Sequence, residues 1–337
     1  MNVPTLPAAW IARLNTFGAS GTPCFFLIDF ELQKPLLLSP EEFGPSGIRF
    51  SFPERPDVRN KAPVPIAMHP TPVPFDRFDR AFRTVQAGLQ RGDSFLTNLT
   101  FATPVELSAS LEDVYQQSHA KYRVYLPGEF VSFSPETFVT IDPSGYLESR
   151  PMKGTAENTP TGRSYLLSSE KEIAEHATIV DLIRNDLSRV ARRVRVTDYR
   201  YLESIETATG GLVQTSSAIG GQLRPDWREN LGTVVGTLLP AGSVSGAPKS
   251  ATLALIRQAE GRDRGYYCGI AGYFDGRRLD TCVLIRYIER VGDRYFFRSG
   301  GGITARSRAE EEYRELNDKI RIPRSGVLPE YLPILAR

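Results

Sequence analysis

Apolar side chains recur at a helical spacing in three parts of the chain. In residues 75–89 they return every three or four positions, up to a stop at Gly92. A second such stretch runs from about 170 to 190, and a more charged third stretch from 307 to about 320. This period places the apolar side chains of a helix on one face, where they can pack against a core. We therefore predict an amphipathic helix in each stretch.

Strand-like segments occupy much of the remaining chain. They are short, rich in aromatic and β-branched residues, and bounded by Pro or Gly, which favours antiparallel sheet. The clearest lie at residues 24–29, 33–38, 48–52, 95–101, 130–133 and 294–298. Because helices and strands do not alternate regularly, the sequence predicts an α+β fold and not a doubly wound parallel sheet.

Seven prolines between Pro53 and Pro74 mark the best candidate for a boundary. Proline is excluded from helix interiors and central strands, so this stretch should cross the surface in an extended form. We expect residues 1–75 to form a short strand-rich segment packed on the main domain. Residues 76–325 would form that domain, and residues 326–337 a tail.

The composition narrows the classes of protein. With 337 residues and 41% apolar side chains, the chain can bury a large core. Its 41 Lys and Arg against 39 Asp and Glu leave no long-range field to attract nucleic acid. The three cysteines are far apart, which favours reduced thiols, and no apolar run approaches the roughly 20 residues that span a bilayer. We expect a cytoplasmic protein with no nucleic-acid or membrane partner.

Two pairs of glutamates are candidates for a metal site. Glu172 and Glu175 are three residues apart, as are Glu312 and Glu315, and this spacing puts both carboxylates of a pair on one helix face. Two or three carboxylates with open positions suit Mg²⁺. Spacing alone also allows ordinary structural roles. These are a capping box at Ser169–Glu172 or Ser307–Glu310, and helix-surface ion pairs at Lys171–Glu175 or Glu315–Lys319.

Other segments offer chemistry that the sequence alone leaves open. Lys153 is either a solvated loop residue or, if desolvated or near a cation, a nucleophile with a lowered pKa. Gly300–Gly302 follow a predicted strand and would permit a turn whose amides face a carboxylate, or only a loop. His176 is a packing residue or an acid–base group. The run 242–250 superficially resembles a phosphate loop, but Pro248 stands where the motif needs glycine.

Together these segments resemble the chorismate-utilising family of anthranilate, aminodeoxychorismate, isochorismate and salicylate synthases. The matching pieces cover roughly residues 93 to 320 in the order of the family. They are Ser134-Pro135-Glu136, residues 150–155, 175–187, 242–249 and 265–269, Ile285-Arg286, residues 300–303, and Glu312-Tyr313 with Glu315 and Lys319. The resemblance implies a single large chorismate-binding domain, in which antiparallel sheets form a sandwich flanked by helices.

The resemblance also implies roles for particular residues. Glu175 and Glu315 match the principal Mg²⁺ ligands, and Glu172 and Glu312 match positions that support the ion directly or through water. The ion would bind the ring carboxylate of chorismate and assist departure of the C4 hydroxyl. Substrate-binding positions are matched by Tyr267, Arg286, Gly301, Gly302, Thr155, His176 and Lys319. Glu136 is a candidate catalytic proton donor, although a structural role is open.

Lysine at position 153 distinguishes the subfamilies. Anthranilate synthases typically have alanine there, whereas aminodeoxychorismate synthases have lysine. The implied reaction begins when Lys153 attacks C2 of chorismate and expels the C4 hydroxyl. Ammonia then attacks C4 and expels the lysine. The product would be 4-amino-4-deoxychorismate, a precursor of 4-aminobenzoate and folate.

The alternative functions are other reactions of the same family and a protein without catalytic activity. Isochorismate and salicylate synthases use a lysine base on an early strand, but residues 93–100 contain no lysine. No glutaminase triad accompanies the cysteines, so ammonia would come from glutamine through a separate amidotransferase subunit. An anthranilate synthase component I and a catalytically silent chorismate-binding module remain as alternatives.

Overall fold

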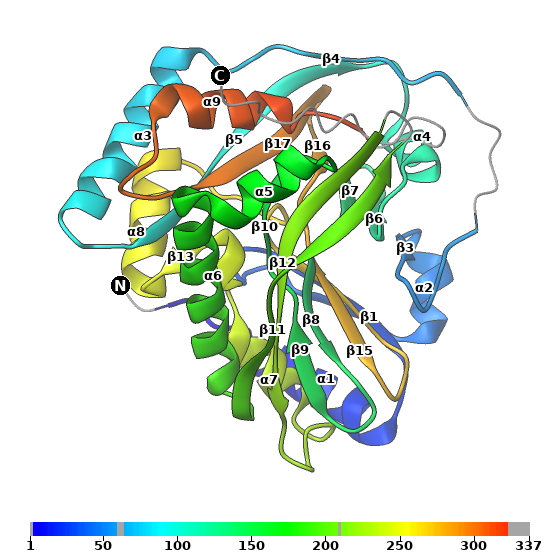
Figure 1. The fold of residues 1–337 in the computed structure, drawn as a ribbon. Coiled ribbons are helices and arrows are strands. Elements are labelled where there is room, and N and C mark those ends of the chain that lie inside the picture. The colour runs from blue at the N-terminus through cyan, green and yellow to red at the C-terminus, as the bar shows by residue number, and fades with distance from the viewer. Residues whose placement is uncertain (1–2, 59–63, 208–209, 323–337) are drawn as a thin grey trace.

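The computed structural model describes residues 3–58, 64–207 and 210–322 (Figure 1). The helices are α1 (Ala8–Ser20), α2 (Pro40–Ser46), α3 (Phe75–Gln90), α4 (Leu111–Gln117), α5 (Pro160–Ser168), α6 (Glu170–Ser188), α7 (Leu231–Leu238), α8 (Lys249–Glu260) and α9 (Ala309–Asp318), with a 3-10 turn η1 (Gly242–Val244). The strands are β1 (Cys24–Ile28), β2 (Leu36–Leu38), β3 (Arg49–Ser51), β4 (Met68–Pro70), β5 (Leu96–Leu107), β6 (Tyr122–Leu126), β7 (Phe130–Ser134), β8 (Thr137–Ile141), β9 (Tyr146–Ser149), β10 (Met152–Glu157), β11 (Arg192–Thr207), β12 (Gly210–Gln222), β13 (Gly246–Ala247), β14 (Ile270–Phe274), β15 (Leu279–Val283), β16 (Tyr287–Val291) and β17 (Arg294–Ile303).

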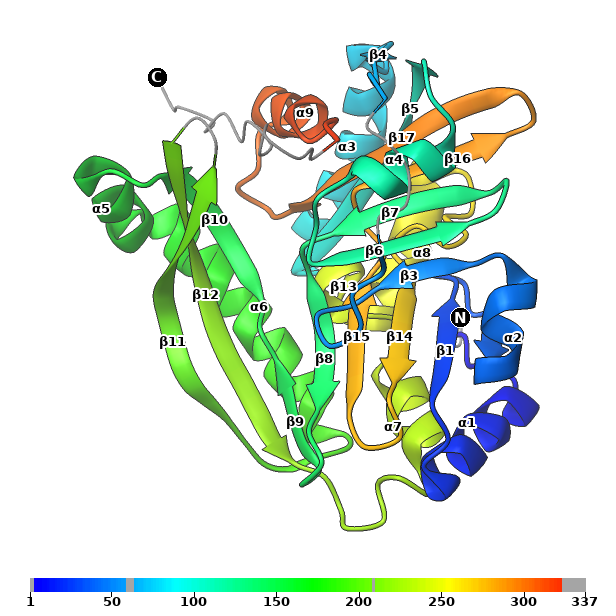
Figure 2. The same ribbon diagram turned by 90° about the vertical axis from the view of Figure 1, so that its right-hand side faces the viewer.

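The strands form two antiparallel sheets. One has nine strands in the order β10-β12-β9-β8-β15-β14-β1-β2, with β11 also paired to β12. The other has eight strands in the order β13-β5-β17-β16-β7-β6-β3, with β4 also paired to β5. In Figure 2 the strands of the nine-stranded sheet lie roughly vertical, and those of the eight-stranded sheet cross above them. The α+β fold with antiparallel sheets and flanking helices is confirmed.

Three helices pack against β5 and β17 of the eight-stranded sheet, and α4 packs against β6 and β7. Helix α3 contacts both β5 and β17, α8 contacts β5, and α9 contacts β17. Helix α3 also packs against α8 and against α9. Phe78, Phe82 and Val85 of α3 are buried with Leu99 and Phe101 of β5 in one apolar cluster. The helical spacing of these α3 residues is what predicted the helix. The chain turns after it at Gly92, where φ is +83°. The prediction for residues 75–89 is confirmed.

The largest apolar core joins the nine-stranded sheet to α6. Ile179 and Ile183 of α6 lie in the same cluster as Ile141 of β8 and Ile219 of β12. α6 packs along β10, β11 and β12, so its amino-terminal half reaches β10. The helix predicted from 170 to 190 is confirmed as α6.

Several elements were not predicted. The helices α1, α2, α4, α5, α7 and α8 lie where no helical period was identified, and α2 and α4 have only 7 residues each. So few residues leave little period to detect. In the proline-dense stretch β4 pairs with β5, while residues 59–63 lie outside the described residues. Strands from residues 1–75 belong to both sheets; the limits of this segment and of the tail stay predictions.

Two expectations from composition can be compared with the structure. Cys24, Cys268 and Cys282 are all buried free thiols. Within the ranges that the structure describes, no helix combines the length and the apolar character needed to cross a bilayer. Because the three thiols are buried, they contribute to packing. Burial also raises the pKa of each thiol above its ordinary value.

Asp280 is expected to make stability depend on pH. Tyr122 Oη donates a 2.8 Å hydrogen bond to its carboxylate, yet burial raises the pKa of Asp280 from 3.8 to about 6. Because the folded pKa lies above the unfolded value, the ionised carboxylate costs up to about 3 kcal/mol above pH 6, and this cost disappears as the pH falls toward 4. Asp280→Asn should therefore raise the free energy of unfolding more at pH 8 than at pH 4.5, as measured by urea unfolding.

The matched control for this prediction is Asp263→Asn, because Asp263 is exposed. Its effect should be small at both pH values. An Asp280→Asn effect that is equal at pH 4.5 and pH 8 would contradict the burial argument.

Candidate active site

Strand β10 presents Lys153 beside a bulge. The pairing of β10 with β12 shifts register between Lys153 and Thr155, and Gly154 at the shift has a φ of +78°. Glycine enters this left-handed region without the strain that a Cβ imposes. A Cβ on Gly154 would also lie 2.5 Å from Glu172 Oε2. Gly154 therefore allows α6 to approach β10 closely.

Gly154→Ala is expected to destabilise the fold by about 1–3 kcal/mol and to displace Glu172, because alanine at this φ is strained and meets the carboxylate. Urea unfolding measures the loss. Gly128→Ala is the matched control, since Gly128 has a φ of +73° with nothing within 4 Å of its would-be Cβ. Equal losses in the two variants would show that contact with Glu172 contributes nothing.

Lys153 is surrounded by carboxylates. Its Nζ lies 2.9 Å from Glu175 Oε2, with 28% of the lysine side chain and 11% of the glutamate side chain exposed. Burial lowers the pKa of Lys153, but the charges of Glu175, Glu315 and Glu172 outweigh burial and raise the pKa above its ordinary value. In this arrangement Lys153 is an ammonium group. The lowered pKa expected of a desolvated lysine is not found, because negative charge dominates its surroundings.

The second glutamate pair comes from α9. Lys319 Nζ lies 2.6 Å from Glu315 Oε1 and donates a 2.7 Å hydrogen bond to Gly300 O. The predicted ion pair at Glu315–Lys319 is confirmed. A Cβ on Gly301 would lie 3.5 Å from both Glu312 Oε2 and Glu315 Oε1, so both glutamates of α9 face this backbone.

The glycine triplet lies within strand β17 and does not form the expected turn. Gly300, Gly301 and Gly302 pair with Thr100, Leu99 and Asn98 of β5. A Cβ on Gly302 would stand 4.0 Å from Lys153 Nζ. The prediction of a turn was wrong because tertiary packing, and not a left-handed backbone, requires glycine here. At Gly300 a Cβ would lie 2.5 Å from Leu99 O, so this position has no room for a side chain.

The two predicted capping boxes have different outcomes. Ser169 is the N-cap of α6, and its Oγ accepts a 3.4 Å hydrogen bond from the backbone N–H of Glu172. Ser307 does not cap α9, whose N-cap is Arg308. Instead, Ser307 Oγ accepts from the N–H of Thr304 at 3.2 Å, because the chain makes a turn before the helix begins. The box at Ser307–Glu310 was therefore wrong.

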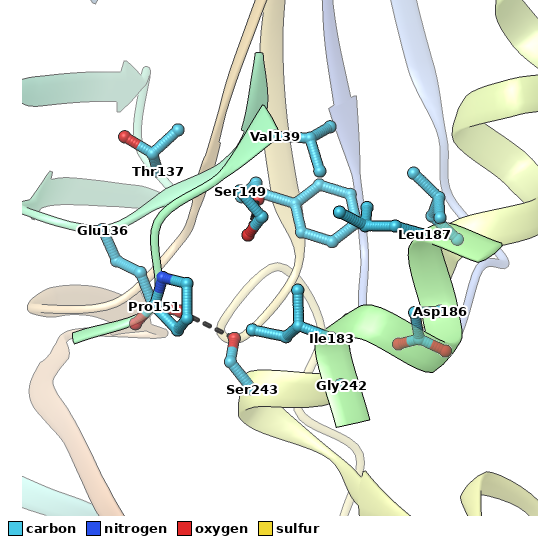
Figure 3. Close-up of a pocket in the computed structure, with 12 residues that line it drawn as sticks. Glu136, Thr137, Val139, Ser149, Pro151, Ile183, Asp186, Leu187, Gly242 and Ser243 are labelled. Atoms are coloured by element: carbon cyan, nitrogen blue, oxygen red, sulfur yellow. Dashed lines mark hydrogen bonds between the residues drawn. The ribbon is translucent and has the colours of Figure 1, made fainter. Parts of the chain in front are cut away.

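Glu136, between β7 and β8, lies near both lysines. Ser243 Oγ donates a 2.6 Å hydrogen bond to its Oε1 (Figure 3). Burial raises the pKa of Glu136, against the opposing effects of Ser243, Lys319 and Lys153. The carboxyl adjoins a cavity of ≈ 20 Å³, which is large enough for a single water molecule. Its geometry and raised pKa suit a group that donates a proton.

His176 is fully buried on α6. Its Nε2 lies 2.7 Å from Ser217 Oγ, which accepts a 2.9 Å hydrogen bond from the backbone N–H of Arg200. Burial, with the charges of Arg200 and Lys153, lowers the pKa of His176 to about 4, so the imidazole is neutral near pH 7. Its Nδ1 has no hydrogen-bond partner among the described residues. A packing role and a ligand contact both remain compatible with this geometry.

The predicted carboxylate-binding residues have distinct surroundings. Tyr267 is 3% exposed, with the Arg298 guanidinium 5.0 Å from its ring centroid. Arg286 has a φ of +52°, and its Nη1 donates a 2.9 Å hydrogen bond to Lys319 O, which ties it to the end of α9. Thr155 belongs to β10, but its side chain is not among those that the structure describes.

Sequence reasoning missed the side chains that support these groups. Ser243 and Ser217 are ordinary serines whose partners become visible only in the folded chain. Asp186 and Lys249 form a 2.9 Å ion pair with each side chain 11% exposed. The paired residues join α6 to the amino end of α8, which supports a buried network for Asp186. The nearby polar residues of α6, Asp181, Arg184 and Asn185, are exposed.

The carboxylates of α6 and α9 are chemically suited to Mg²⁺. Glu172, Glu175, Glu312 and Glu315 face the space around Lys153 and Gly301, and hard oxygen donors are the ligands that Mg²⁺ takes. In the described residues, no three His, Cys, Asp or Glu side chains form a cluster that could hold an ion by themselves. Mg²⁺ commonly binds one or two protein carboxylates and completes its shell with water and substrate oxygens.

The fold and this group of residues define a chorismate-utilising enzyme. A family model described as chorismate binding enzyme matches residues 48–325, and the chain belongs to that family. A PabA-like protein of Haemophilus influenzae, described as uncharacterized, is 45% identical over 319 residues, which are 94% of this chain and 97% of the relative. Aminodeoxychorismate synthase component 1 of Escherichia coli is 32% identical over 262 residues, 73% of this chain and 56% of that enzyme.

Solved structures show the same architecture. Anthranilate synthase component I from Streptococcus pneumoniae is 28% identical, with a TM-score of 0.63, over 80% of this chain and 61% of that one. MenF, the menaquinone-specific isochorismate synthase from Escherichia coli, is 16% identical with a TM-score of 0.68, over 92% of this chain and 79% of that one. The second likeness concerns the fold alone.

Proposed function

We propose that this chain converts chorismate and ammonia to 4-amino-4-deoxychorismate and leaves the enolpyruvyl group attached. The observation that carries the proposal is the position of Lys153. Its amine lies 2.9 Å from Glu175 and 4.0 Å from the position that a Cβ on Gly302 would occupy. A primary amine between two acidic helices is suited to attack a ring held there, and the relative named aminodeoxychorismate synthase component 1 supports the same activity.

The proposed reaction consists of two allylic displacements. Lys153 Nζ, as the free amine, forms a bond to C2 of chorismate while both ring double bonds shift, from C1=C2 and C5=C6 to C1=C6 and C4=C5, and the C4–O bond breaks. The departing hydroxyl takes up a proton and leaves as water. Ammonia then bonds to C4, both double bonds return to C1=C2 and C5=C6, and the C2–N bond to Lys153 breaks. Two displacements give retention at C4, and the covalent route divides one difficult substitution into two easier steps.

The chain supplies the charges that this reaction needs. Mg²⁺ held by Glu175 and Glu315, with Glu172 and Glu312 in support, would act as a Lewis acid toward substrate oxygens and offset the negative charge that raises the pKa of Lys153. Arg286 and Lys319 provide cationic groups at the end of α9 for the substrate carboxylates. The ring is proposed to lie against the backbone of Gly301 and Gly302, which carry no side chain.

Glu136 is proposed as the proton donor to the departing hydroxyl. Its pKa is raised by burial, and Ser243 fixes one carboxylate oxygen at 2.6 Å. The charges of Lys319 and Lys153 act on the pKa of Glu136, which supports a position near the proposed ring site. A carboxyl group whose pKa is raised gives up its proton at a higher pH than an ordinary glutamate, which is the direction that favours general-acid catalysis.

The ammonia is proposed to come from a glutamine amidotransferase subunit. The name component 1 of the similar enzyme supports a two-component arrangement. The three thiols of this chain are buried and have raised pKa values, which is unsuited to the thiolate that a glutaminase requires. With ammonium salts in place of glutamine, the chain should therefore act without the partner.

The product of the reaction tests the proposal. The chain is incubated with chorismate, Mg²⁺ and ammonium, and the mixture is analysed by mass spectrometry and fluorescence. The proposal expects a non-aromatic amino product that retains the enolpyruvyl group. Fluorescent anthranilate with release of pyruvate would instead establish the anthranilate synthase reaction, and binding of chorismate without turnover would establish a silent module.

A further inference from the structure

A hollow of about 330 Å³ lies outside the candidate active site. It is bounded by the segment from Thr71 to Pro74 before α3, by β5 and β17, and by the residues after α8. Figure 2 shows β4, β5 and β17 together at the top of the molecule, where this segment begins. The hollow shares no lining residue with the site around Lys153. Its volume is that of a small-molecule site.

Three arginines line this hollow: Arg77 of α3, Arg262 after α8, and Arg294 of β17. In the described part of the chain, Arg77 and Arg294 make no ion pair. Arg262 contacts Glu289 at 3.3 Å, but the same carboxylate oxygen lies 3.0 Å from Arg298. Positive charge is therefore in excess around the hollow.

The nearby charges confirm this excess. Burial and the charges of Arg298 and Arg77 lower the pKa of Arg262, against the opposing charges of Glu289 and Glu260. Glu260 is already paired with the buried Arg264 at 2.6 Å. The first turn of α3 also borders the hollow; no side chain caps this helix, and the acidic residue of this turn, Asp76, does not line the hollow. The positive end of its dipole adds to the field of the arginines.

The wall between the arginines is apolar. It is formed by Pro72, Val73, Ala102, Pro104 and Phe296. The guanidinium of Arg294 lies 5.2 Å from the centroid of the Phe296 ring, a geometry that holds the group over the ring while its N–H edge can still donate. Arginines around an apolar wall match a ligand with acidic groups on a compact apolar body.

We propose that this hollow binds a small organic anion with two acidic groups, one for Arg77 and one for Arg294. Calorimetric titration of the full chain with isophthalate, an aromatic dicarboxylate, tests the proposal. The wild type should bind it, and the double variant Arg77→Ala/Arg294→Ala should bind it at least about tenfold more weakly. Both side chains are exposed, so the melting temperature of the variant should stay unchanged.

Two controls make the result decisive. Arg80→Ala removes an exposed arginine of the same helix that does not line the hollow, and it should leave the affinity unchanged. Inorganic phosphate, which lacks an apolar body, should bind more weakly than isophthalate. Isophthalate is a ring dicarboxylate like the proposed substrate, so it could also bind at the candidate active site. Unchanged affinity for isophthalate in the double variant would show that it binds outside the hollow, which would overturn the proposal. The proposal is also overturned if the wild type binds no isophthalate, or binds phosphate equally well.

Discussion

Lys153→Arg and Lys153→Ala should each lower the rate of 4-amino-4-deoxychorismate formation by at least about 1,000-fold, as expected when a nucleophile is removed. Arginine keeps a positive charge beside Glu175, but its guanidinium stays protonated and cannot attack C2. Lys153→Arg therefore distinguishes the role of Lys153 as a nucleophile from its role as the positive partner of Glu175. The rate is measured with saturating chorismate, Mg²⁺ and ammonium, and the fold is checked by thermal unfolding.

Lys34→Ala is the control for this pair of variants, because Lys34 is an exposed lysine outside the candidate site. Its activity should equal that of the wild type. If Lys153→Arg retained most of the activity, the lysine would act through its charge alone, and the covalent route would be excluded.

Glu175→Gln and Glu315→Gln should each weaken the binding of Mg²⁺ by about 10-fold to 100-fold or more, because each change removes a charged oxygen ligand. Metal affinity is measured by calorimetric titration of Mg²⁺ in the presence of chorismate and without ammonia, so the readout does not depend on product formation. The concentration of Mg²⁺ that gives half-maximal activity should rise in parallel.

Glu311→Gln provides a matched control on α9. Glu311 lies next to Glu312 in the sequence but pairs with Arg308 at 3.7 Å, so its change should leave metal affinity unaltered. Equal affinities in Glu175→Gln, Glu315→Gln and the wild type would exclude both glutamates as ligands. The structure already gives them another role, since each pairs with a lysine.

The spacing of residues along the chain correctly predicted the features that depend on neighbours within one helix. The spacing of Phe78, Phe82 and Val85 specified a helix face, and the structure buries that face. The three-residue spacing of Glu172 and Glu175 placed both on one side of α6, as did that of Glu312 and Glu315 on α9. The motifs around Lys153 also identified the family, which the family model confirms.

Contacts between distant segments could not be predicted in this way. Pairing of β1 with β14 joins Cys24 to Phe274, and no local pattern identifies such a partner. The glycines of β17 resembled a turn because sequence gives no indication that a Cβ on Gly300 would lie 2.5 Å from Leu99 O of the neighbouring strand. The raised pKa of Lys153 likewise depends on carboxylates from two helices that are remote in the sequence.

A trapped covalent intermediate would test the central claim most directly. The chain is mixed with chorismate and Mg²⁺ without ammonia, quenched rapidly with acid, digested, and analysed by tandem mass spectrometry. The account predicts an adduct of chorismate minus water on the peptide that contains Lys153, absent from Lys153→Arg and lost when ammonium is added before quenching. Steady formation of the amino product with no adduct on Lys153, or with an adduct on another residue, would contradict it.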